Sequence, residues 1–161
     1  MPVTSVDKNL DAHTMTITAH YPAPIDRVWQ VWADPRLLER WWGPPTYPAT
    51  VVDHELAPGG RVSYFMTSPE GEKYHGWWRI VTVEPPVVLE FEDGFADNEG
   101  HENPDLPVTR TRVRLESDGE GTRMIIESRF ADADAMQQLL TMGMEEGMVA
   151  ALGQIDALVA V

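Results

Sequence analysis

The chain has 161 residues, a length that suits one domain, and its 26 acidic against 12 basic residues give a formal net charge of −14. Such an acidic surface disfavours binding to nucleic acid or to anionic membranes. The absence of cysteine excludes disulfides and zinc–thiolate sites and fits a cytoplasmic location, and no stretch approaches the roughly 20 apolar residues that a membrane span needs.

The first strand is predicted at residues 14–21, where every second residue is apolar and most are β-branched or aromatic. Residues 1–13 before it are expected to form a flexible leader. Their sequence lacks the apolar centre of a signal peptide. The remainder, residues 14–161, is expected to fold as a single domain.

Two short helices are predicted after this strand. Apolar residues at three- and four-residue spacing indicate an amphipathic helix that contains Ile25, Val28, Trp29 and Trp32. Asp34-Pro35 ends this helix and can cap a second one over residues 36–41. Gly43-Pro44-Pro45 then breaks the second helix.

A run of six strands is predicted next, followed by one long helix. The strands are expected at residues 47–56, 61–66, 74–83, 87–93, 109–117 and 122–130, with a long loop over 94–107. Short hairpin turns between strands make the sheet antiparallel. Residues 135–161 have a helical period and would span about 40 Å at 1.5 Å per residue. The fold class is therefore α+β.

The alternation of residues in the strands predicts one apolar, aromatic face that the long helix covers. Glycines at positions 143 and 147 of that helix indicate either close packing on the sheet or room for a ligand. We expect a cavity there, although the same side chains also fit ordinary core packing. The candidate lining residues are Trp32, Trp41, Trp42, Val62, Tyr64, Met66, Trp78, Phe91, Phe95, Met136, Leu140, Gly143 and Gly147.

Two residues are candidates for acid–base chemistry near this cavity. His54 lies on the same face of its predicted strand as two apolar residues, and Asp93 lies on the same face as Phe91. Each also fits a structural role, as a hydrogen-bonded histidine or a solvated strand end. Phe95 follows in the loop and could cover the entrance. No nucleophile elbow, metal-ligand spacing, phosphate loop or dinucleotide fingerprint is present, so we expect no metal and no cofactor.

Several short motifs occur in the order of a known family. They are Ala23-Pro24-Ile25-Asp26-Arg27-Val28-Trp29, Leu38-Glu39-Arg40-Trp41-Trp42-Gly43-Pro44, Pro58-Gly59-Gly60-Arg61, Tyr74-His75-Gly76, Glu84-Pro85-Pro86 and Gly143-Met144-Glu145-Glu146-Gly147. With them the chain resembles, from about residue 14 to 161, the activator-of-heat-shock-protein-ATPase-homologue family of the START-related, birch-pollen-allergen-like (SRPBCC) superfamily. The resemblance implies a helix-grip fold, in which a curved antiparallel sheet of about six or seven strands wraps around a long C-terminal helix.

The resemblance does not imply one activity, because relatives bind hydrophobic ligands, catalyse cyclisation or aromatisation, sequester toxins or stimulate a chaperone. Our first hypothesis is a module that carries or sequesters a small aromatic or lipid-like molecule. The second is a cofactor-independent enzyme of the cyclase or aromatase kind. The third is a stress-linked co-chaperone that docks a basic protein partner through its acidic surface and an outward Trp77. Each is compatible with a monomer or a homodimer.

Overall fold

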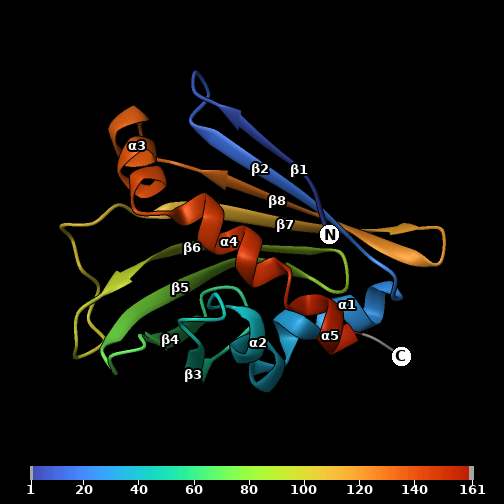
Figure 1. The fold of residues 1–161 in the computed structure, drawn as a ribbon, viewed down its shortest axis with the longest axis horizontal. Helices are drawn as coiled ribbons and strands as arrows, with labels where there is room; N and C mark the ends of the chain where they lie inside the picture. The colour runs from blue at the N-terminus through green and yellow to red at the C-terminus, as the bar shows by residue number, and fades with distance from the viewer. Residues whose placement is uncertain (1, 160–161) are drawn as a thin grey trace.

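The structure is a computed structural model that describes residues 2–159, and it has the α+β helix-grip architecture (Figure 1). Its strands are β1 (Val3–Asn9), β2 (Thr14–Tyr21), β3 (Ala49–His54), β4 (Arg61–Thr67), β5 (Lys73–Glu84), β6 (Val88–Ala96), β7 (Thr109–Asp118) and β8 (Gly121–Arg129). Its helices are α1 (Ile25–Ala33), α2 (Pro35–Trp41), α3 (Ala133–Thr141), α4 (Met144–Leu152) and α5 (Ile155–Val159). None of these helices is long and apolar enough to cross a membrane.

The strands form a single curved sheet in the order β1-β2-β8-β7-β6-β5-β4-β3, and every neighbouring pair is antiparallel. Hairpins connect most neighbours, as the short turns in the sequence predict. Helices α1 and α2 carry the chain from β2 to β3 at the far edge of the sheet. Asp34 lies between them, and its side chain accepts a hydrogen bond from the Arg36 amide at 2.9 Å, which caps α2.

The N-terminal segment differs from the flexible leader that the sequence predicts. Residues Val3–Asn9 form the edge strand β1, which pairs with β2 along its length, for example Val6 with Ile17. Most β1 side chains are exposed, so the alternation that reveals a half-buried strand is missing. Backbone hydrogen bonds hold this strand in place, together with an ion pair between Lys8 and Glu145 of α4 at 2.6 Å.

The C-terminal helix also differs from the continuous one that the sequence predicts, because it is divided into α3, α4 and α5. Gly143 has a φ of +92°, a left-handed conformation that glycine adopts at little cost and that ends α3 before α4 begins. Figure 1 shows α4 crossing the sheet, with α3 and α5 at opposite ends. The last two residues of the predicted helix lie outside the described residues.

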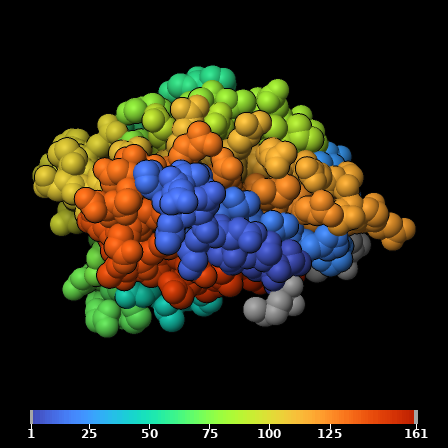
Figure 2. Space-filling model, turned by 90° about the horizontal axis from the view of Figure 1, so that it is seen from above, coloured from blue at the N-terminus to red at the C-terminus, as the bar shows by residue number. Residues whose placement is uncertain are grey.

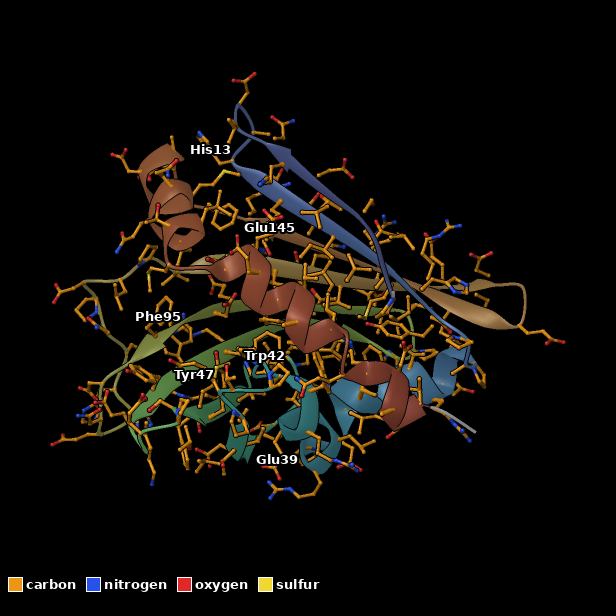
Figure 3. The ribbon with its side chains drawn as sticks, in the orientation of Figure 1. His13, Glu39, Trp42, Tyr47, Phe95 and Glu145 are labelled. Carbon is orange, nitrogen blue, oxygen red and sulfur yellow. The ribbon has the colours of Figure 1, made fainter. Side chains whose placement is uncertain are left out.

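The two ends of α4 are held in different ways. Near its C-terminal end, the Tyr21 hydroxyl donates to the Leu152 carbonyl at 3.0 Å, and the Gln154 amide donates to the carbonyls of Gly43 and Trp41 at 2.7 and 3.3 Å. The N-terminal end has the exposed Lys8–Glu145 pair. In Figure 2 the N-terminal strands (blue) lie directly against C-terminal residues (orange to red), and Figure 3 shows Glu145 on the side of α4 that faces them.

Candidate ligand-binding pocket

A pocket of about 280 Å³ lies between the inner face of the sheet and the α3–α4 segment. This volume is at the lower end of the range for small-molecule sites. The pocket is lined by Trp42, Pro44, Met66, Asp93, Phe95, Pro107, Thr109, Thr111, Ser128, Leu139, Met142, Gly143, Met144, Gly147 and Met148. Figure 3 labels Trp42 and Phe95, which approach the pocket from different parts of the chain.

Most of the pocket wall is apolar. The side chain of Trp42, which follows α2, is 8% exposed and meets Trp78 edge to face, with ring centroids 4.8 Å apart. It therefore rests on the aromatic core and presents the rest of its surface to the pocket. Met144 and Met148 of α4 also line the pocket, and flexible thioether side chains adapt readily to the shape of a ligand.

One end of the pocket is polar because the register of three strands brings short polar side chains together. Asp93 of β6 is opposite Thr109 of β7, and Thr111 of β7 is opposite Ser128 of β8. The Thr111 hydroxyl donates a hydrogen bond of 3.0 Å to Asp93 Oδ1. Within residues 2–159, Asp93 Oδ2 and the hydroxyls of Thr109 and Ser128 make no hydrogen bond, so they are available to a ligand.

Asp93 is half-buried, and burial raises its pKa from 3.8 to about 7, while the hydrogen bond from Thr111 acts in the opposite direction. Its carboxyl group therefore exists in both protonation states near neutral pH. A group of this kind can accept and return a proton, or hold a ligand by a hydrogen bond in either state.

A second polar feature lies behind the pocket, around Tyr64. Burial and the negative charge of Asp93 raise the pKa of the Tyr64 hydroxyl, while the indole N–H groups of Trp42 and Trp78 lower it. Neither indole nitrogen reaches hydrogen-bond geometry with any described residue, although both are buried. These two N–H donors are the buried side-chain polar atoms of the described chain that remain without a partner.

Six of the residues predicted from the sequence line this pocket. They are Trp42, Met66, Asp93, Phe95, Gly143 and Gly147. Others lie in the core instead, because they are deeper between the sheet and the helices: Trp32, Trp41, Val62, Trp78, Phe91 and Met136 are each at most 2% exposed. Tyr64 and Leu140 are half-buried and lie outside the lining.

His54, the other predicted acid–base candidate, lies away from the pocket. Its Nε2 is 3.1 Å from the carbonyl oxygen of Trp32, which fits the structural histidine that the sequence also allowed. The structure thus brings only Asp93 of the two candidates into the pocket.

The sequence did not single out the hydroxyl residues at the polar end. Thr109 and Thr111 alternate with the arginines of β7, and Ser128 has the inward parity of β8, so alternation could have identified all three as inner-face residues. Pro44 and Pro107 come from irregular segments, which carry no periodic signal.

Trp77 is not the exposed contact residue that the co-chaperone hypothesis requires. It lies on the outer face of the sheet, as its parity predicts, but is only 3% exposed. Its ring lies over Gly94, its Nε1 donates to the Phe95 carbonyl at 3.1 Å, and the Arg79 guanidinium lies 5.3 Å from the ring centroid. Glycine at position 94 leaves room for this indole, and the residue is covered rather than presented to a partner.

Within residues 2–159, no group of three or more histidine or acidic side chains is arranged to hold a metal ion. The features of the pocket are thus an apolar wall and a polar end around Asp93.

Comparisons with known proteins show which proteins this chain resembles. Residues 22–160 match the family model described as activator of Hsp90 ATPase homolog 1-like protein. The crystal structure of protein Ms6760 from Mycobacterium smegmatis is similar, with 52% identity over 99% of this chain and 98% of that one and a TM-score of 0.92. A solution structure from Arthrobacter aurescens has 50% identity over 98% and 92% of the two chains and a TM-score of 0.95.

A more distant solution structure from Staphylococcus epidermidis has 26% identity over 97% of this chain and 93% of that one, with a TM-score of 0.84. The same fold therefore persists at low identity. No protein in the curated comparison matches the chain.

Proposed function

The chain belongs to the family of activator of Hsp90 ATPase homolog 1-like proteins, and from this premise we propose that it is a binding module that carries or sequesters a small, mainly apolar molecule. The observation that supports the proposal is the pocket of about 280 Å³ with an apolar wall and one polar end. Its size suits a single-ring compound or a short chain. We retain the cytoplasm as the proposed compartment because the chain has no cysteine.

Thermal denaturation in the presence of propylbenzene or 2-phenylethanol tests this function. A ligand at 100 times its Kd stabilises the folded state by about 2.7 kcal/mol, which corresponds to a rise in Tm of roughly 5–10 °C for a chain of this size. Native mass spectrometry of the purified protein will show any compound that it retains. If neither probe shifts Tm and no compound is retained, the proposal is wrong.

A pair of variants of α4 locates the binding site. Gly147→Leu adds a side chain where a Cβ atom meets nothing within 4 Å, so it fills part of the pocket and should abolish the ligand-induced shift. Ala150→Leu places the same side chain on the exposed face of the same helix and should leave the shift intact. Equal effects of the two substitutions would place the ligand elsewhere.

Asp93 supports a second candidate function, a cofactor-independent enzyme that moves a proton on a bound cyclic substrate. Its pKa of about 7 suits a group that accepts a proton and returns it at neutral pH. In such an enzyme Asp93→Asn removes turnover but keeps ligand binding. Unchanged turnover in the folded variant would refute this role.

A further inference from the structure

We propose that the pocket selects an organic amine, a compound with a small apolar body and a protonated amino group that pairs with Asp93. This inference rests on the proposed binding function and specifies its ligand. It follows from the composition of the pocket wall: among the described residues that line the pocket, Asp93 is the only one with an ionisable side chain, and none is a cation. Its single hydrogen bond comes from the neutral Thr111.

An unpaired carboxylate in an apolar pocket is energetically costly, and an opposite charge close to it offsets this cost. Most other carboxylates in the central strands have a partner on the protein: Glu90 pairs with Arg110, and Glu92 pairs with Arg79, at 3.3 and 3.5 Å. Those pairs lie on the outer face of the sheet. On the inner face of β6 the basic side chain is missing, and a ligand can supply the positive charge.

The groups around Asp93 match the hydrogen-bonding needs of an ammonium head group. An ammonium group has three donors and no acceptor. Asp93 Oδ2 and the hydroxyl oxygens of Thr109 and Ser128 can each accept a hydrogen bond, and all three residues line the same end of the pocket. The aromatic rings of Trp42 and Phe95 add surfaces that attract a cation.

An anionic ligand is disfavoured at the same place. Its charge would meet that of Asp93, no lining residue is basic, and the whole chain carries a formal charge of −14. A neutral alcohol can donate only one hydrogen bond to these acceptors and does not compensate the charge. The amine should therefore bind more tightly than an alcohol of equal size, and the alcohol more tightly than a carboxylate.

Isothermal titration calorimetry with 2-phenylethylamine, 2-phenylethanol and phenylacetate tests this order at pH 8, because the three probes share one ring and differ in charge. We expect the amine to bind at least about tenfold more tightly than the alcohol. Asp93→Asn should remove this preference, because the amide keeps an oxygen acceptor but carries no charge. Glu120→Gln makes the same change of charge in the exposed turn before β8 and should preserve the preference.

The pH dependence of the wild-type protein gives a second, independent readout. With the pKa of Asp93 at about 7, its ionised fraction falls from about 0.9 at pH 8 to about 0.1 at pH 6, so amine affinity should fall about tenfold. Tyr64, the other titratable group close to Asp93, has a raised pKa and stays protonated in this range. The amino group of the probe also stays protonated.

The outcomes separate this inference from the proposed function. If 2-phenylethanol binds as tightly as the amine, or if the preference for the amine survives Asp93→Asn, the pocket binds apolar molecules without selecting amines. If none of the probes binds, both proposals are wrong. Strong binding of phenylacetate would also overturn the charge argument.

Discussion

Replacing Gly147 and Gly143 with alanine should change the stability of the protein in opposite directions, although both glycines line the pocket. Gly147 lies within α4, where a Cβ atom would have no neighbour within 4 Å. Alanine is favoured over glycine in a helix by about 1 kcal/mol. Gly147→Ala is therefore expected to stabilise the fold by that amount and to raise Tm by about 2–4 °C.

At Gly143 the same substitution forces a side chain onto a backbone with a φ of +92°. The left-handed conformation costs a residue other than glycine roughly 1–2 kcal/mol. Crowding adds little, since the nearest atom to the new Cβ would be Glu146 Oε2 at 3.9 Å. Gly143→Ala is expected to lower Tm by about 2–8 °C, solely through the backbone.

Urea and thermal denaturation of both variants at pH 7, with circular dichroism as the probe, will measure the two effects. A fall in stability for Gly147→Ala would mean that α4 lies closer to the sheet than the structure shows, and hence that the pocket is smaller. An unchanged stability for Gly143→Ala would mean that α3 and α4 are not separated by a left-handed residue. Either result would refute the reasoning.

Burial raises the pKa of Asp93 to about 7 in the folded protein. The contribution of the protonated carboxyl group to stability is therefore fully present below the pKa of the unfolded chain, near 4, and is lost as pH rises through 7. Asp93→Asn should therefore stabilise the fold relative to wild type at pH 8 by on the order of 2–4 kcal/mol, and this difference should vanish near pH 4. A difference in stability that stays constant with pH in urea titrations would contradict this. Trp32 is fully buried, and Trp32→Ala should cost about 3–5 kcal/mol in the same titrations. Trp42→Phe should instead reduce the fluorescence response to a bound probe, and a full response would place the ligand away from Trp42. Lys8→Met removes an exposed ion pair with Glu145 and should lower stability only slightly, and a large loss would argue for a buried role of the pair.

The strands and the first two helices could be predicted because their residues repeat with a clear period. Strand alternation placed Trp78, Phe91 and Asp93 on the inner face, and the structure confirms this. The edge strand β1 escaped prediction because an exposed edge strand needs no apolar face. The break between α3 and α4 depends on a backbone angle at Gly143, and a helical period continues across that residue without revealing it.

The pocket was harder to predict than the fold. Trp32 and Trp42 are chemically identical, yet Trp32 is buried at the centre of the aromatic cluster and Trp42 lines the pocket. What separates them is depth relative to the sheet, which depends on how α1 and α2 dock. Alternation gives Thr111 and Ser128 inward parity, but their position opposite each other depends on the register of β7 and β8, which alternation does not contain.

The unequal anchoring of the two ends of α4 has a consequence for the rates of ligand exchange. Three hydrogen bonds hold the segment around Leu152 and Gln154, whereas the first turn has the exposed Lys8–Glu145 pair and follows a glycine. Transient opening should therefore begin at the first turn, beside the methionines of the pocket. Salt screens the exposed pair, so it should speed the entry and the release of an uncharged ligand together and leave its equilibrium affinity nearly constant.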